Sequence, residues 1–362
     1  MGSERQNVGW RAWAPALLAA LLLAAALQSR RLVERRRGGL ASAPSAAADA
    51  PPVLNLIMVG LGGFRGLAAE VLWFRADRLQ QEGRYVELVQ LSEWIARLDP
   101  RATETWAYSA WNMAYNISAM MNRPDDRLRW VTHGVSLLRD DALAWNPADA
   151  RLYRELAWLY LHKIGSDSDT AHVFYKLSLA DAMAPLLCPD GTVPPDAASD
   201  RGLAELRLEG VRMRELQARF GPIDWRVPES HALYWAWQGI PHAVGAESLA
   251  CRRSVCQALA ASVAQGRFTG ELDGGRWQTA PNLALTAATI RFYEETCAVF
   301  PTPGMRNAFG YFLVGRLRSA QAAGDKQAAR MYEERLKHLG FAGDGVAARD
   351  AATDRGTRAE ED

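Results

Sequence analysis

The segment from Gly83 to Pro100, GRYVELVQLSEWIARLDP, constrains the fold of this chain more than any other stretch. It begins with a glycine, which tolerates the backbone angles of a tight turn. Apolar residues then recur at the spacing of one helix face, at Tyr85, Leu88, Ile95 and Leu98. The helix is expected to stop before Pro100, because proline disfavours the helical conformation of the residue before it. Counting back to residue 69 predicts a helical hairpin, which needs stacked neighbours to bury its apolar face.

A similar arrangement returns twice further along the chain. Thr103 begins a second unit, in which Trp106 takes the large aromatic position of the first helix and Ala110 the small position that follows. This unit lacks the turn glycine, is stretched by a loop at residues 122–126, and is expected to end before Pro147. It is therefore longer than the first.

A third unit begins at Ala150. Its first helix carries matching residues at Tyr153, Leu156, Ala157 and Tyr160, and a second helix is expected from about residue 170 to 187. The units resemble tetratricopeptide repeats (TPR) over about residues 69–187, and more weakly over 310–341. The resemblance implies a stack of helical hairpins whose first helices line a groove for peptides or extended segments of partner proteins.

The remainder of the body predicts further helices after a loop. Residues 188–206 contain two proline-rich turns, which are typical of loops. Helices are expected at residues 207–220, 230–240, 248–265 and 283–300, with a last repeat-like hairpin at 310–341. Two short alternating runs around Asp273-Gly274 predict a β-hairpin within 267–277. The predicted fold class is mostly α: a TPR-like stack of helical hairpins, additional C-terminal helices and one small β-hairpin.

The N-terminal region predicts a membrane segment. Residues 13–27 form an apolar run that is short for a spanning helix, which takes about 20 residues. Residues 24–26 offer a weak signal-peptide cleavage site. The arginines between residues 30 and 37 resist export of the chain that follows, so an uncleaved single anchor is preferred to a cleaved signal. The side of the membrane that holds the soluble body stays open.

These patterns divide the chain into segments. Residues 1–12 are expected as a tail, 13–29 as the anchor or uncleaved signal, and 30–52 as a basic, then Ala/Pro-rich linker. Residues 53–187 are expected as helical repeats, with 53–63 as a helix that leads into them or, alternatively, a second membrane span. Residues 188–341 form the helical C-terminal part, and 342–362 form a disordered tail.

Composition excludes some classes of function. The 42 basic and 41 acidic residues leave a net charge of +1, whereas a general nucleic-acid binder usually carries a basic excess. The cysteines are too sparse for a disulfide framework. We expect all of them to be ordinary thiols, with a Cys251–Cys256 disulfide as the alternative; they are Cys188, Cys251, Cys256 and Cys297.

The TPR resemblance also implies which residues face the groove. Aromatic rings beside arginines suit extended ligands or carboxylate termini. The alternative is that the tryptophans among these residues pack as core. Carried onto this chain, the groove positions are Glu70, Trp73 and Asp77 in the first unit, Glu104, Trp111 and Tyr115 in the second, and Arg151, Arg154, Trp158 and His162 in the third.

A cluster of polar residues around the turn of the third unit permits a second interpretation. A metal site would need His162 and His172 to converge, with Asp167 or Asp169 as a third ligand. The preferred interpretation is structural, because aspartates before a helix commonly cap its exposed amide groups.

These observations favour a membrane-tethered TPR-like scaffold or adaptor that binds partner proteins without catalysis or cofactor and does not bind nucleic acid. The alternatives are a metal-assisted enzyme that uses the His162–His172 region, and a structural subunit of one permanent complex.

Overall fold

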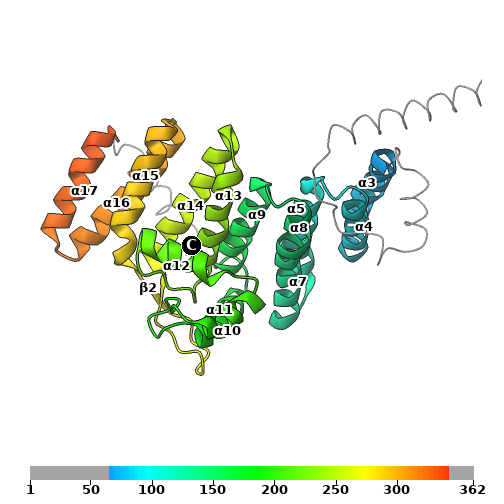
Figure 1. Cartoon of the computed structure of the whole chain (residues 1–362), viewed down its shortest axis with the longest axis horizontal. Coiled ribbons are helices and arrows are strands. Elements are labelled where there is room, and N and C mark those ends of the chain that lie inside the picture. Colours follow the sequence, from blue (N-terminus) through cyan, green and yellow to red (C-terminus); the bar gives the residue numbers. More distant parts are fainter. Residues whose placement is uncertain (1–64, 342–362) are drawn as a thin grey trace, which may run out of the picture. The chain divides into compact units, whose positions relative to one another are not determined.

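The chain is built almost entirely from helices in the part that the structure describes. The computed structural model describes residues 65–341, apart from the side chains of residues 65–70, Trp73 and Arg97. Within this range the helices pack as hairpins and the sheet has two strands (Figure 1). The predicted fold class, mostly α with a helical-hairpin stack and one small β-hairpin, is confirmed. The chain divides into two compact units, Met1–Ser109 and Ala110–Asp362.

The first unit contains the hairpin predicted around Gly83. Helices α3 (Arg65–Gln81) and α4 (Tyr85–Leu98) are joined there, and the φ angle of Gly83 is 70°, in the left-handed region that favours glycine. The amide groups of Gly83 and Arg84 donate to the carbonyl oxygens of Gln80 and Leu79, at 3.1 and 2.9 Å. These bonds satisfy carbonyl groups at the end of α3 and turn the chain back on itself.

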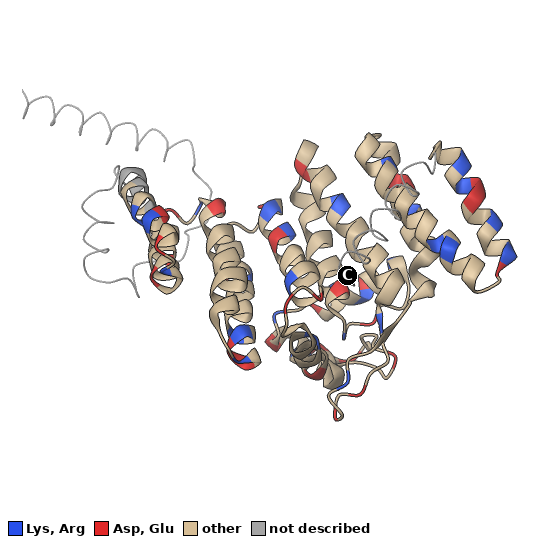
Figure 2. Cartoon of the chain, turned by 180° about the vertical axis from the view of Figure 1, so that it is seen from behind, with Lys and Arg blue, Asp and Glu red and all other residues tan. Residues whose placement is uncertain are grey.

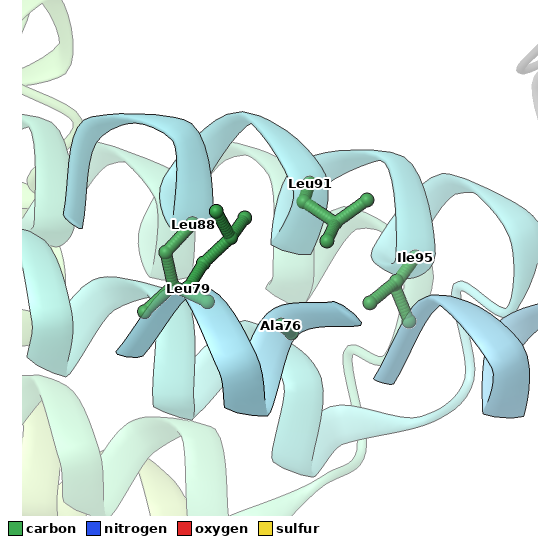
Figure 3. Packing of buried hydrophobic residues seen from close by; sticks show 5 residues of the cluster. All are labelled: Ala76, Leu79, Leu88, Leu91 and Ile95. Carbon is green, nitrogen blue, oxygen red and sulfur yellow. The ribbon is translucent and has the colours of Figure 1, made fainter. Parts of the chain in front are cut away.

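Apolar residues spaced along one face of each helix hold this hairpin together (Figure 3). Ala76 and Leu79 of α3 pack with Leu88, Leu91 and Ile95 of α4, and each of these side chains is at most 5% exposed. The apolar residues that recur at helical spacing in α4 therefore form its buried face.

Three long helices follow, two of them interrupted by a π turn and the third ending in one. Helix α5 (Thr103–Trp111) continues through η1 (Asn112–Ile117) into α6 (Ser118–Met120), α7 (Pro124–Ser136) through η2 (Leu137–Ala142) into α8 (Leu143–Trp145), and α9 (Ala150–Trp158) through η3 (Leu159–Ile164). The second and third units thus have the first helices that the sequence predicts. π turns are rare in proteins, but those that do occur frequently lie at functional sites.

The second compact unit, which begins at Ala110, continues as a row of helices that lie side by side in chain order (Figure 1). After α9 the row contains α13 (Pro228–Gly239), α14 (Gly245–Gln265), α15 (Thr286–Val299), α16 (Pro303–Ala322) and α17 (Lys326–Leu339). Short 3-10 turns, η5 (Ile240–His242) and η6 (Leu283–Leu285), precede α14 and α15.

The partner of α9 differs from the prediction. The sequence pairs α9 with the helix at 170–187, but α13 packs most extensively against it. A Cβ atom on Gly239, at the end of α13, would lie 3.1 Å from the Cβ of Tyr153, near the start of α9. A Cβ atom on Gly165, just beyond η3, would lie 3.3 Å from the Cβ of Pro228. Helix α9 with η3 and helix α13 are therefore antiparallel neighbours.

The segment between these two helices holds α10 (His172–Met183), η4 (Ala184–Leu186), α11 (Ala197–Glu205) and α12 (Gly210–Phe220). Helix α11 lies within residues 188–206, which the sequence analysis assigns to a loop. It begins after Asp196, whose carboxylate accepts from the amide groups of Ala198 and Ser199 at 2.9 and 2.8 Å. The aspartate thus supplies a helix cap directly after Pro194-Pro195.

The predicted β-hairpin follows α14. Strands β1 (Arg267–Phe268) and β2 (Thr279–Ala280) are antiparallel, and a further bridge joins Glu271 to Arg276 near the turn.

The four cysteines are free thiols, as predicted. Among residues 65–341, no helix is both long enough and apolar enough to cross a membrane. The predicted tail, anchor and linker (1–52) and the predicted C-terminal tail (342–362) lie outside the described residues.

Helices α5 and α7 approach closely at Gly134. A Cβ atom there would lie 2.7 Å from the carbonyl oxygen of Ala110, so Gly134→Ala is expected to lower the free energy of unfolding by about 1–3 kcal/mol. Gly315 is the matched control, because a Cβ atom on this exposed residue of α16 meets nothing within 4 Å. Gly315→Ala is expected to add up to about 1 kcal/mol through helix propensity. Urea unfolding measures both changes, and equal effects would contradict the close approach.

Candidate partner-binding surface

Two aromatic pairs occupy equivalent positions in consecutive units. Trp111 is the last residue of α5 and stacks on Tyr115 in η1, with ring centroids 5.4 Å apart. Trp158 is the last residue of α9 and lies against His162 in η3, with ring centroids 3.7 Å apart. In both cases the tryptophan precedes the π turn and its partner lies within it. We call these four residues the aromatic strip.

The strip presents large apolar rings to solvent. Trp111 is 43% exposed and Trp158 is 46% exposed, whereas Trp225 and Trp106 are buried. Burial raises the pKa of Tyr115 to about 12, and the neighbouring Trp158 side chain partly opposes this. The Tyr115 hydroxyl is buried and has no hydrogen-bond partner among the described residues. The two aromatic pairs therefore meet where Trp158 lies beside Tyr115.

His162 is held in its neutral form within the strip. Burial lowers the pKa of its imidazole below the usual value. Its Nε2 atom is buried and has no hydrogen-bond partner among the residues of the described range. A neutral imidazole that lies tilted against an indole behaves as an apolar surface with one unused polar atom.

A hollow of about 230 Å³ adjoins the strip at Trp158. Helix α9 contributes Arg154, Glu155 and Trp158 to its wall, and α14 contributes Arg253 and Ser254. Arg154 forms an ion pair with Glu247, also of α14. The hollow thus combines an exposed aromatic ring with charged groups from two neighbouring helices.

A buried ionic network supports the strip from below. The carboxylate of Asp169 accepts from Lys163 at 2.5 Å, from Arg127 at 2.9 Å and from Tyr175 at 3.2 Å. The Asp169 and Lys163 side chains are only 7% and 6% exposed. The Lys163 ammonium also lies 5.2 Å from the centre of the Tyr115 ring. The network therefore joins α7, η3 and α10 directly beneath the aromatic residues.

Part of the predicted groove is assembled in this way. Trp111, Tyr115, Trp158 and His162 form the strip, and Arg154 lies in the hollow beside it. The other predicted groove arginine, Arg151, is half-buried, and its amide group donates to Asp149 at 2.9 Å. The alternative interpretation, that Trp111 and Trp158 pack as core, is contradicted by their exposure.

Four predicted groove positions belong neither to the aromatic strip nor to the lining of the hollow: Glu70, Trp73 and Asp77 in the first repeat, and Glu104 in the second. Asp77 is exposed and accepts a hydrogen bond from Gln81 at 2.8 Å. Glu104 is exposed as well. The side chains of Glu70 and Trp73 lie outside the described residues, so their groove role stays a prediction.

Sequence reasoning missed the residues that α14 contributes to the hollow. Arg253, Ser254 and Gln257 line it from a helix that matches no repeat unit in the sequence. Their spacing places them on one helix face, but nothing in a single sequence indicates that this face lies beside α9.

The predicted histidine pair does not converge on a common site. His172 pairs with Asp167, at 3.0 Å, and the same carboxylate also binds Lys176. Asp169 belongs to the buried network and accepts the amide group of Ala171, just before α10 begins. Within the described range, no group of three or more His, Cys, Asp or Glu side chains could hold a metal ion.

Charges of both signs are interspersed over the described helices (Figure 2).

A comparison with protein-family models finds no match, and a comparison with curated proteins finds none either.

Proposed function

We propose that this protein is a membrane-tethered, TPR-like adaptor that binds an extended segment of a partner protein on the aromatic strip and catalyses no reaction. The observation that carries the proposal is the exposure of Trp111 and Trp158 at equivalent positions of α5 and α9, the first helices of the second and third repeats. Tryptophan is enriched among the residues that dominate the energy of protein–protein interfaces. A partner that covers both rings would remove a large apolar area from water.

The form of the strip favours an extended segment over a compact ligand. Its rings come from two separate helices, so a chain that crosses both can meet one aromatic pair after the other. The ionic network beneath holds these helices in place, so little ordering of the protein is needed on binding. Preorganised aromatic surfaces of this kind serve recognition of peptide segments.

The membrane tether rests on the apolar run at residues 13–27 and the arginines that follow it. The TPR assignment rests on the turn, spacing and stop signals around Gly83 and Pro100 and on their return in later units. Under this proposal, the helical part of the chain presents its binding surface close to a membrane, and its partners are membrane-associated proteins.

Trp158→Ala is expected to weaken partner capture about 30-fold, corresponding to about 2 kcal/mol for an interface tryptophan. The full-length protein is crosslinked in its native membrane, and captured proteins are quantified by mass spectrometry against the unaltered protein. The helical circular dichroism signal and the melting temperature confirm that the variant folds.

Trp94→Ala is the matched control, because Trp94 is 39% exposed but lies on α4, away from the strip residues in sequence and unit. This variant is expected to capture partners as the unaltered protein does. Equal losses in both variants, or unchanged capture by Trp158→Ala, would contradict a partner-binding role for the strip.

A further inference from the structure

The hollow beside Trp158 carries two charged groups of opposite sign that do not satisfy each other. Arg253 of α14 is exposed, and its guanidinium has no hydrogen-bond or ion-pair partner in the described part of the chain. Glu155 of α9 is half-buried, and its carboxylate likewise forms neither contact with a described residue. By contrast, Arg154 in the same wall is paired with Glu247.

The surroundings of Glu155 leave its charge incompletely compensated. Burial raises the pKa of this carboxyl group, and the nearby Arg154 and Arg151 only partly oppose the shift. A half-buried carboxylate is stabilised when a cation or hydrogen-bond donor approaches it. A positive group inside the hollow would therefore be favoured beside Glu155, just as a negative group would be favoured beside Arg253.

We propose that this hollow binds a small dipolar ion of the α-amino acid type. The ligand carboxylate pairs with the Arg253 guanidinium, and the ligand ammonium pairs with the Glu155 carboxylate and approaches the face of the Trp158 ring. Ser254 and Gln257 supply further hydrogen-bonding groups on the α14 side. This binding activity goes beyond the adaptor function and does not depend on it.

The size of the hollow agrees with such a ligand. Its volume of about 230 Å³ is below the range of about 300–1,000 Å³ that is common for drug-sized ligands. It corresponds to the space of about eight water molecules at about 30 Å³ each. A single amino acid fits this space better than a nucleotide or a folded peptide, and it carries both charges in one small molecule.

The proposal is tested with the full-length protein and each standard amino acid in turn, by ligand-observed saturation-transfer NMR. At least one amino acid is expected to bind with a dissociation constant below about 1 mM, which is about −4 kcal/mol. For that amino acid, the N-acetyl derivative lacks the ammonium and the carboxamide derivative lacks the carboxylate. Each derivative is expected to bind at least about tenfold more weakly.

Two variants connect the ligand charges to the protein. Arg253→Gln and Glu155→Gln are each expected to weaken binding of the free amino acid at least about tenfold. In addition, Arg253→Gln should reduce the penalty for the carboxamide, and Glu155→Gln the penalty for the N-acetyl derivative. Arg330→Gln is the control, because Arg330 is an exposed arginine of α17, outside the lining of the hollow. Thermal melting confirms that the variants fold.

Several outcomes would overturn the proposal. They are the absence of binding by every amino acid, equal binding of the capped derivatives, and unchanged binding in Arg253→Gln and Glu155→Gln. Preferential binding of peptides through acidic side chains alone would also overturn it, since one charge would then suffice. Trp158 is not used as the test residue because it borders both surfaces, so loss of amino acid binding leaves the adaptor function to be judged separately.

Discussion

In the Asp169→Asn variant, the free energy of unfolding of the second compact unit is expected to fall by about 3 kcal/mol. The carboxylate of Asp169 receives hydrogen bonds from Lys163, Arg127 and Tyr175 in a site where almost none of it is exposed. Replacing it with a neutral amide leaves the buried ammonium of Lys163 without its counter-ion. An uncompensated buried charge of this kind is among the most destabilising changes in proteins.

The pH dependence of stability provides an independent readout of the same contacts. Burial alone would raise the pKa of Asp169, but hydrogen bonds from Lys163, the Ala171 amide and Arg127 outweigh it and lower the pKa from 3.8 to about 2. The stabilisation is therefore present above pH about 4 and is lost as the pH falls towards 2. Urea unfolding at several pH values should show the unaltered protein and Asp169→Asn converging in this interval.

The matched control is Asp125→Asn. Asp125 forms an exposed ion pair with Arg123 at 3.0 Å, and solvent-exposed pairs contribute little to stability. A small effect is expected there at every pH. If Asp169→Asn unfolded at the same urea concentration as Asp125→Asn, the buried network would not be a major source of stability.

The Trp225→Ala variant is expected to destabilise the second unit by about 3–5 kcal/mol, as truncation of a large buried aromatic side chain does. Trp225 is 0% exposed, and its indole N–H donates to Gln217 at 2.7 Å. Its carbonyl oxygen lies 3.0 Å from Nε2 of His231, a residue of α13 that is itself 1% exposed. The truncation would therefore leave a cavity beside α13 and remove one of the two hydrogen bonds to the Gln217 side-chain oxygen, which also accepts from the Val193 amide at 2.8 Å.

Guanidinium unfolding followed by circular dichroism measures this loss. Trp158→Ala serves as the comparison within the same unit, because Trp158 is 46% exposed and its truncation opens no closed cavity. It is expected to cost about 1 kcal/mol or less. A Trp225→Ala protein as stable as Trp158→Ala would show that the loop around Trp225 does not support α13.

The features that sequence alone predicts are those that depend on neighbouring residues. Gly83 adopts the left-handed backbone that its position in the turn requires, and α4 ends at Leu98, directly before Asp99-Pro100. The spacing of Leu88, Ile95 and Leu98 correctly predicts buried positions of α4. Likewise, Trp158 and His162 fall one helical turn apart, so their contact follows from the helix itself.

The partner of α9 depends on packing between segments that are distant in sequence. Most residues of α13 are buried, so the helix shows no polar face from which its neighbours could be inferred. The sequence interval that separates α9 from α13 contains three helices, which hides the pairing from any analysis of consecutive units. Arg253 and Ser254 were missed as lining residues for the same reason, because the contact of α14 with α9 also joins segments that are distant in sequence.

The π turns have a consequence for any ligand that crosses from one helix to the next. Because an α-helix advances by about 100° per residue, an extra residue in a turn rotates all later side chains around the helix axis by roughly that amount. Side chains before η1 and side chains after it therefore point in different directions along one continuous helix, and η3 likewise turns its own last residues relative to α9. Deletion of Leu161 from η3 would turn Lys163 away from Asp169 and shift His162, while Trp158, which precedes the π turn, would keep its position.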